Sequence, residues 1–335
     1  MVDYVINHEK LITAEEFNTN LTSCKLNERD SNNKPSIFKT RKRNSKYEGS
    51  AGQLRVLSRI ITLVLADVLD QSQVGSMIVA LQEVSQIITA PKLTRFEVVI
   101  TMKDIIESYL DRRVEAIEEF NMPKPRPKHH MMSHYPRCYL KYGPLIGMWS
   151  LRMESKHTFI KSVIKSSKNF KNVTKTAATR HEMAQICHRY YGLFPTNKYE
   201  IPSDAVMLSD YREGVDYPNV ADACNKFSSE SLLMNKVKVF GTTYSPGKAV
   251  VMNKDNFGEL SVGLIKIIIL SDNKVYFLCK TVKIFQDRHN FYIFKEVISE
   301  NVWLAQDDLL DYYPLTCYGS ASNMRLVLHH FVSER

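Results

Sequence analysis

Histidine is concentrated in one basic part of this 335-residue chain, where six of the ten histidines lie between Lys124 and Arg189. His129 or His130, followed by His134, has the H-x3–4-H spacing that can place two imidazoles on one zinc ion. Tetrahedral zinc needs two further ligands, and the chain contains no CxxC pair that would supply two thiolates. On spacing alone, the alternative that these histidines are hydrogen-bonded packing residues is favoured. The pattern therefore predicts no more than a zinc half-site.

One carboxylate stands alone in the same basic part. Glu154 is the only acidic residue in 120–181, and a carboxylate among so many cations strongly prefers its charged form. Two roles fit it: a metal ligand beside a phosphate backbone, or a local ion pair with Arg152, Lys156 or Lys161 on a helix. Two-metal phosphoryl transfer needs several carboxylates in one pocket. We therefore expect Glu154 to be a vestigial catalytic residue and the isolated chain not to be an enzyme.

The positive charge is strongly localised. The net charge is +9, yet residues 124–189 hold 14 Lys and Arg against two acids, and residues 34–46 hold six basic residues and no acid. Such patches suggest a polyanionic partner, most simply nucleic acid, whereas the alternative is a merely solvated basic face. Because base-reading motifs are scarce, we expect phosphate contacts with little sequence preference. The expected contacts are Lys128, Arg137, Lys141, Arg152, Lys156, Lys161, Lys165, Lys168 and Lys171.

Composition also narrows the cellular setting. The most apolar helical stretch, Leu54–Leu69, carries Arg55, Arg59 and Asp67, so it predicts a core helix and no membrane association. The six cysteines are scattered, and no signal peptide is recognisable, which favours a reduced, intracellular and non-secreted protein. The KTRKR run at 39–43 fits a nuclear-import signal, so we expect a nuclear location and otherwise a cytoplasmic one.

Residue periodicity predicts an α+β fold. Residues 1–52 are polar and are expected to be partly disordered. From 53 to 200 we expect a helical domain, because apolar residues recur every three to four positions and Thr94 with Glu97 has capping-box spacing. A linker is expected over 201–235. Over 236–335, about six runs rich in β-branched and aromatic residues alternate with turn signals, which predicts a small all-β barrel or sandwich.

A longer pattern links the basic segment to a known group of proteins. Residues 124–163 contain a PKHH–HYP block at 127–136, a Gly143-Pro144-Leu145 turn, Trp149 and an MESKH–FIK block at 153–161. The same group is suggested by LFPTNKYE at 193–200 and DLLDYYPL at 308–315. The sequence resembles the C-terminal part of cut-and-paste DNA transposases of the CACTA/Mirage/Chapaev group, and of proteins derived from them in arthropods.

The resemblance implies a ribonuclease-H-like core with an inserted helical region, in which two aspartates and a later glutamate hold the catalytic metals. It also implies a zinc site made by an upstream CxxC and a histidine pair. His129 and His134 match that pair, and Glu154 lies twenty residues beyond His134, where the glutamate is expected. The CxxC is missing, however, and only Asp3 and Asp30 precede the helical domain.

These departures predict the C-terminal half of a transposase that lacks its two catalytic aspartates. Zinc is then expected only in an incomplete site, and Mg²⁺ only if a separate upstream half supplies the aspartates. The first functional hypothesis is a transposase-derived, catalytically incomplete DNA-binding protein. The second is a protein-interaction module, a helical bundle and β-barrel that recruits protein partners and has no nucleic-acid role. A third is a nuclease completed by a separately encoded N-terminal half.

Overall fold

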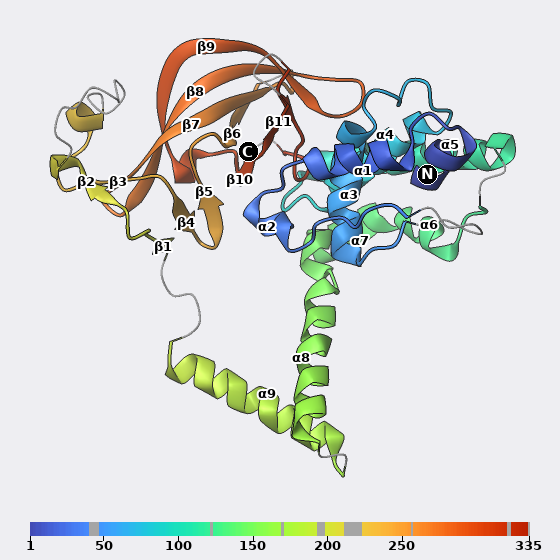
Figure 1. Ribbon diagram of the computed structural model, residues 1–335, viewed down its shortest axis with the longest axis horizontal. Coiled ribbons are helices and arrows are strands. Elements are labelled where there is room, and N and C mark those ends of the chain that lie inside the picture. The colour runs from blue at the N-terminus through green and yellow to red at the C-terminus, as the bar shows by residue number, and fades with distance from the viewer. Residues whose placement is uncertain are drawn as a thin grey trace.

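The computed structural model has a helical part that comes first in the chain and a part made of antiparallel sheets that follows (Figure 1). The structure describes residues 1–39, 47–120, 123–168, 171–192, 198–210, 223–255, 257–319 and 323–333, and for residues 28, 29, 151–155 and 296–299 it describes the backbone alone. This order of helices and sheets confirms the predicted α+β class.

Helices occupy the described chain as far as Tyr190. In chain order they are the π-helical η1 (Tyr4–His8), α1 (Ala14–Ser23), α2 (Glu28–Ser31), α3 (Ala51–Val64), α4 (Gly75–Ile88), the π-helical η2 (Glu97–Met102), α5 (Lys103–Phe120), α6 (Pro127–Met132), α7 (Tyr135–Tyr142), the 3-10 turn η3 (Leu145–Met148), α8 (Leu151–Ser167) and α9 (Val173–Tyr190). Among the described residues, no helix combines the length and the apolar character that crossing a bilayer requires.

The helical unit, residues 1–148 as far as they are described, is built on one apolar core. α3 begins at a capping box, because Ser50 Oγ accepts the Gln53 N–H at 3.3 Å while Gln53 Oε1 accepts the Ser50 N–H at 2.8 Å. Its inner face carries Ile60 and Val64, both buried in a cluster shared with α4 and α5. The helical periodicity of the sequence therefore corresponds to a real buried face.

The N-terminal segment is part of this core. α1 starts at the capping box formed by Thr13 and Glu16, and its Phe17 and Leu21 are buried. Phe38 packs edge-on against Phe17, with ring centroids 6.2 Å apart. A few widely spaced apolar side chains thus anchor residues 1–39 to the helices. Residues 40–46, with most of the KTRKR run, lie outside the described residues.

Short and long strands follow the helices. They are β1 (Tyr199–Glu200), β2 (Val206–Met207), β3 (Leu232–Met234), β4 (Val237–Val239), β5 (Thr242–Tyr244), β6 (Ala249–Lys254), β7 (Leu260–Ser271), β8 (Lys274–Gln286), β9 (Tyr292–Ala305), β10 (Asp311–Leu315), β11 (Cys317–Tyr318) and β12 (Arg325–Leu326), with 3-10 turns at Leu208–Asp210 and Gln306–Asp308. β2 and β3 lie within the expected linker 201–235, and β3 pairs with β7.

The sheet unit, residues 198–333 as far as they are described, contains one large and one small sheet. The large sheet follows the order β10-β6-β7-β8-β9-β12-β11, with β3 and β2 added beside β7, and the small one follows β1-β4-β5. β7 and β8 are joined by a turn at Asp272-Asn273, whose φ values of 48° and 59° are those of a tight hairpin turn. All described pairings are antiparallel.

The small sheet packs on one face of the large one, and Tyr244 lies 4.9 Å from Phe277 between their ring centroids. Register shifts interrupt the β7–β8 and β8–β9 pairings, and β7, β8 and β9 curl together (Figure 1). Of the expected barrel or sandwich, a closed barrel does not form in the described chain, because β10 and β11 end the sheet without pairing with each other. The curved strands β7, β8 and β9 therefore belong to an open sheet, and the small sheet packs on one of its faces.

The C-terminal end of the chain fastens the two units together. The Phe331 N–H donates to the Gln86 carbonyl of α4 at 3.0 Å, and Ser333 Oγ donates to Glu97 at 2.5 Å. A second connection is made by His289, whose Nε2 lies 2.8 Å from Asp70. The helical unit and the sheet unit therefore share a polar seam.

Burial makes the fold sensitive to alkali. Burial raises the pKa of Cys279, Tyr292 and Tyr318 to about 12, from ordinary values of 9 for the thiol and 10 for the phenols. A raised pKa means that the folded state holds the proton more tightly than the unfolded state. The stability that these groups contribute is complete below pH 9 to 10 and is lost as the pH rises toward 12.

We therefore expect the thermal unfolding temperature to fall steadily as the pH is raised above about 9.5. Circular dichroism melts between pH 8 and pH 11 measure it. Tyr318→Phe should make the fall shallower, whereas Tyr190→Phe should not, because Tyr190 is 82% exposed. A melting temperature that is constant over this range would contradict the expectation.

Candidate nucleic-acid interface

Helices α8 and α9 form an arm that projects from the helical unit (Figure 1); the name covers the described part of residues 151–190. α9 is capped by Asn172, whose Oδ1 accepts the Lys175 N–H at 3.2 Å, and α8 is closed by Lys168 in a left-handed conformation with φ of 50°. The two helices meet at Phe159 and His181, whose ring centroids are 6.4 Å apart. No described side chain of the arm is buried, so few contacts fix its position.

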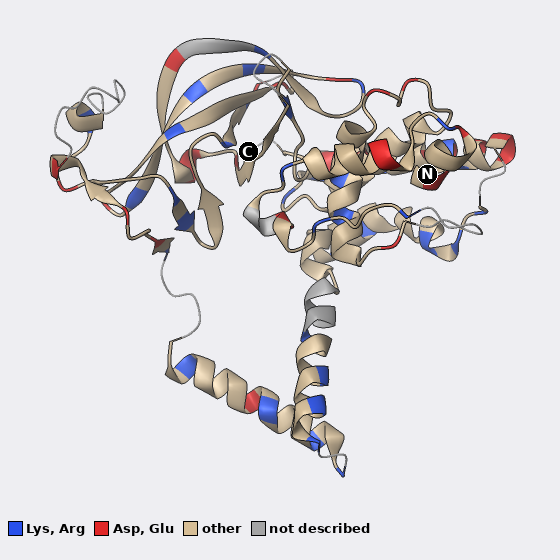
Figure 2. Ribbon diagram, viewed as in Figure 1, with Lys and Arg blue, Asp and Glu red and all other residues tan. Residues whose placement is uncertain are grey.

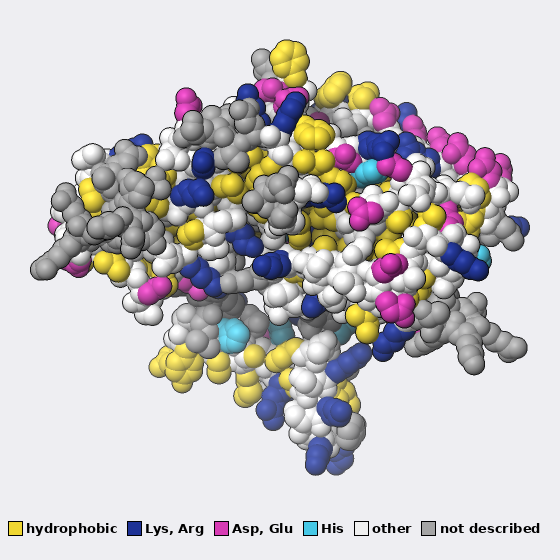
Figure 3. Space-filling view, turned by 45° about the horizontal axis from the view of Figure 1, so that its top comes forward, with side chains coloured by type: hydrophobic (Ala, Val, Ile, Leu, Met, Phe, Trp, Pro, Cys, Tyr) yellow, Lys and Arg dark blue, Asp and Glu magenta, His cyan; other side chains and the backbone are white. Residues whose placement is uncertain are grey.

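Basic side chains line this arm. Lys161 and Lys165 lie one turn apart on α8, Lys168 follows at the C-cap, and all three are exposed. Lys156, five residues before Lys161, is exposed as well. Lys and Arg positions recur along the ribbon of the arm in Figure 2, and Figure 3 shows dark-blue side chains on it, while acidic residues gather on the helical unit. The arm is therefore the most positively charged projection of the described chain.

Acidic side chains do little to neutralise the arm. Glu182 of α9 is 3.7 Å from His181 Nδ1 and is the only arm carboxylate whose side chain is described. No described carboxylate forms an ion pair with Lys156, Lys161 or Lys165. Like charges at this spacing repel one another by a few tenths of a kcal/mol per pair, about 0.2–0.5 kcal/mol. An anion bound from solution would relieve that repulsion.

The remaining predicted contacts are distributed over neighbouring elements. Lys128 of α6 and Arg137 and Lys141 of α7 are exposed, but these helices lie against the helical unit and not in the arm. α7 is anchored by Tyr139, whose hydroxyl accepts the Leu93 N–H at 2.7 Å. Lys171, just before the N-cap of α9, is exposed. Arg152 and Glu154 lie on α8, with side chains outside the described atoms.

The two histidines whose rings are in contact are His130 and His134, whereas the resemblance pairs His129 with His134. His129 Nδ1 accepts the Arg126 N–H at 2.9 Å, and burial together with nearby cations, Arg113 foremost, lowers the pKa of His129. His134 lies beside His130, with their Nε2 atoms 3.3 Å apart and the rings edge to face. Within the described chain, no group of three or more His, Cys, Asp and Glu residues could hold a metal. Two imidazoles do not complete a tetrahedral zinc site.

The sequence reasoning missed a cavity where the two units meet. It is about 420 Å³ in volume and is lined by Asp30, Arg59 and His329 among others. Asp30 was assigned to a polar segment, yet it is 1% exposed and 2.5 Å from Arg59. One signal was present: Arg55 and Arg59 stand one turn apart inside an otherwise apolar helix, where charged side chains require partners.

In comparisons with known proteins, no protein-family model, no curated protein and no solved structure matches the chain.

Proposed function

We propose that the protein binds DNA through the phosphate backbone, with the arm as its main contact surface. The observation that carries this proposal is the row of exposed lysines on α8, for which no described carboxylate serves as an ion-pair partner. Flexible ammonium groups suit phosphates, which are charged points repeated along a duplex. A helix that projects from its body can reach a backbone without bringing the acidic helices close to it (Figure 2).

The proposed binding is not catalytic. Cleavage with two metal ions needs several carboxylates around one pocket, and Glu154 is the only acid that the transposase resemblance assigns to such a site. The described chain contains no metal-binding group of acids, histidines and cysteines. We therefore propose a catalytically incomplete, transposase-derived DNA-binding protein that acts in the nucleus. Mg²⁺ would enter only with aspartates from a separate upstream half.

Changing Lys156, Lys161 and Lys165 together to Ala should weaken binding to a random duplex and flatten its salt dependence. Each lost phosphate contact reduces the slope of log K against log salt by about 0.9, so three contacts reduce it by about 2.7. Fluorescence anisotropy with a labelled duplex at several salt concentrations measures both quantities. Incubation of the wild-type protein with magnesium or manganese should leave the duplex intact.

A charge-matched control separates a contact from a general loss of charge. Lys266, Lys274 and Lys283 are exposed on or next to β7 and β8, so their triple change to Ala removes the same charge from the sheet unit. This control should leave the salt slope nearly unchanged. Equal affinity for DNA in the arm variant and the wild type, or equal losses in the arm variant and the control, would refute the proposal.

A second function has its own observation. Met183, Ile186 and Tyr190 of α9 are 58%, 61% and 82% exposed, and helical spacing places them along one side of the helix. Exposed apolar stripes of this kind fit a protein partner. Binding through such a stripe would depend little on salt, whereas phosphate contacts give a steep dependence. The salt titration therefore distinguishes the two functions.

A further inference from the structure

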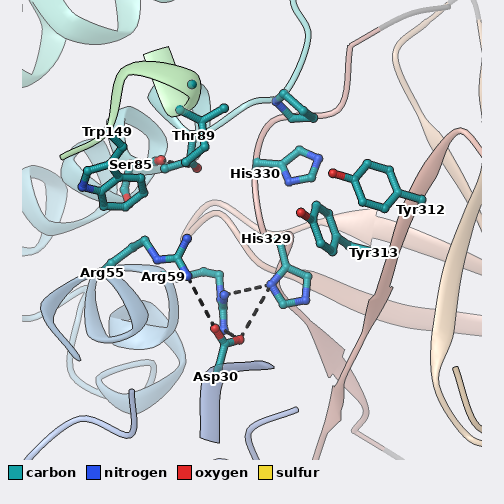
Figure 4. A pocket seen from close by; sticks show the side chains of 13 residues that line it. Asp30, Arg55, Arg59, Ser85, Thr89, Trp149, Tyr312, Tyr313, His329 and His330 are labelled. Atoms are coloured by element: carbon teal, nitrogen blue, oxygen red, sulfur yellow. Dashed lines mark hydrogen bonds and ion pairs between the residues drawn. The ribbon is translucent and has the colours of Figure 1, made fainter. Parts of the chain in front are cut away.

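The cavity between the two units has the size and composition of a ligand site. Its volume of about 420 Å³ falls within the range of about 300–1,000 Å³ that is usual for small-molecule sites. Figure 4 shows that its walls come from two directions, with Arg55, Arg59 and Trp149 on one side and Tyr312, Tyr313, His329 and His330 on the other. The helical unit and the C-terminal end of the sheet unit thus build it together.

The floor of the cavity is a buried polar cluster. Asp30 Oδ2 accepts from Arg59 Nη2 at 2.5 Å, and Arg59 Nη1 lies 2.8 Å from His329 Nδ1. Because a guanidinium only donates, Nδ1 of His329 must accept. The proton of a neutral His329 is then on Nε2, which lies 3.3 Å from the Pro314 carbonyl and 3.1 Å from Asn27 Nδ2. These bonds fix the orientation of each group before any ligand arrives.

One acceptor of this cluster is left for a ligand. Asp30 is 1% exposed, and its Oδ1 has no hydrogen-bond partner among the described residues. Arg55 Nη2 lies 3.9 Å from Oδ1, too far for a hydrogen bond. A buried carboxylate oxygen without a donor is costly, about 1–3 kcal/mol, so a donor from a bound molecule would be strongly favoured.

The walls of the cavity carry planar side chains, both aromatic rings and a guanidinium group. The Arg55 guanidinium lies 5.2 Å from the centre of the Trp149 ring. On the opposite wall, the rings of Tyr312 and Tyr313 are 4.1 Å apart between centroids, and His330 stands 5.4 Å from Tyr313. Asp311 lies 3.4 Å from His330, so a protonated His330 would be neutralised by it. The cavity itself is lined by two guanidinium groups and two imidazoles against one carboxylate.

We propose that this cavity binds a nucleotide. Aromatic rings and guanidinium planes are the surfaces on which nucleobases stack, irrespective of sequence. Asp30 Oδ1 accepts from an exocyclic amino group of the base, and Arg55 pairs with the phosphate. A bare phosphate would leave Oδ1 unsatisfied, and an aliphatic ligand would desolvate the charges without replacing their hydrogen bonds. The base is therefore one with an amino group, as in adenine or cytosine.

The proposal goes beyond DNA binding by the arm. The lining of the cavity includes none of the arm lysines, and its Trp149 precedes α8 in the chain. The nucleotide could be a free mononucleotide or an unpaired residue of a single-stranded nucleic acid, since both present the same base and phosphate. Because binding of a mononucleotide is measured without DNA, its result does not depend on the function proposed for the arm.

Tryptophan fluorescence provides a direct readout. The chain has two tryptophans, and Trp303 packs against Phe227 in the sheet unit, with ring centroids 4.9 Å apart. Trp303→Phe therefore leaves Trp149 as the only reporter. We expect adenosine monophosphate to quench it saturably, uridine monophosphate to bind at least fivefold more weakly, and inorganic phosphate to have no effect. Calorimetric titration of the wild-type protein repeats the measurement should the reporter variant fold poorly.

Arg55→Gln should weaken adenosine monophosphate binding about tenfold or more, since it removes the charged phosphate partner. Arg112→Gln is the control, because Arg112 lies on α5 and donates to the Ser76 carbonyl away from the cavity. Thermal melts show that each variant is folded. A single-stranded oligonucleotide that quenches Trp149, while the mononucleotide does not, would identify nucleic acid as the source. Absence of binding by both, or binding that Arg55→Gln leaves unchanged in a folded protein, would overturn the proposal.

Discussion

Deletion of residues 328–335 is expected to remove most of the stability of the protein. Leu328 and Val332 are 6% and 5% exposed and belong to the core of the sheet unit, while Phe331 packs against the core of the helical unit. Burying one such side chain contributes about 1.5–3 kcal/mol, so the joint loss of all three should cost about 4.5–9 kcal/mol. A domain is stabilised by only about 5–15 kcal/mol in total.

Urea unfolding followed by circular dichroism measures this loss as a lower midpoint. The backbone bond between Phe331 and Gln86 disappears with the same deletion, so the helical unit should also become less stable. Phe257→Ala is the control, because Phe257 is 92% exposed and its change should alter the unfolding free energy by less than about 0.5 kcal/mol. A truncated chain that unfolds at the wild-type urea concentration would show that the C-terminal end does not join the units.

Asp30→Ala is expected to destabilise the fold by about 3–5 kcal/mol, because it leaves the charge of Arg59 buried without its carboxylate. The two side chains are 1% and 8% exposed, so water cannot replace the lost partner. Chemical unfolding of the variant measures the effect. The double variant Asp30→Ala/Arg59→Met should recover part of the loss, since it also removes the stranded charge.

An exposed ion pair provides the comparison. Lys238 Nζ lies 2.9 Å from Glu200, and both side chains are substantially exposed, 40% and 57%. Glu200→Ala should therefore cost less than about 1 kcal/mol. If Asp30→Ala cost no more than Glu200→Ala, the Asp30–Arg59 pair would not be the structural element that its burial indicates.

Much of the helical unit could be predicted because its side chains follow a simple period. Ile61 and Val64 repeat the apolar face of α3, and the capping signals at Thr13 and Thr94 are both realised, the latter by the Glu97 carboxylate accepting the Thr94 N–H at 2.7 Å. Helical periodicity and capping depend only on residues that are close together in the sequence. The Asp272-Asn273 hairpin turn was predictable for the same reason, because both residues tolerate left-handed backbone.

Features that depend on distant parts of the chain could not be predicted. The burial of Asp30 requires α3 from one side and His329 from the other, and nothing near Asp30 in the sequence signals either. The charge of the arm was visible in the sequence, whereas its separation from Lys128 and Arg137 depends on how α6 and α7 pack. Whether the sheet closes into a barrel was equally undetermined, because closure depends on pairing between its first and last strands.

Because no described side chain of the arm is buried, its backbone amides should exchange hydrogen with solvent rapidly. An amide hydrogen exchanges with solvent whenever its helix opens locally, and the free energy of opening depends on the side-chain contacts that must be broken. α9 has no buried side chain along its described length, whereas β8 is flanked by β7 on one side and β9 on the other. Opening α9 therefore requires little free energy, whereas opening β8 requires disruption of the whole sheet. Bound ligands that order the arm would protect its amides first, long before they affected those of the sheet.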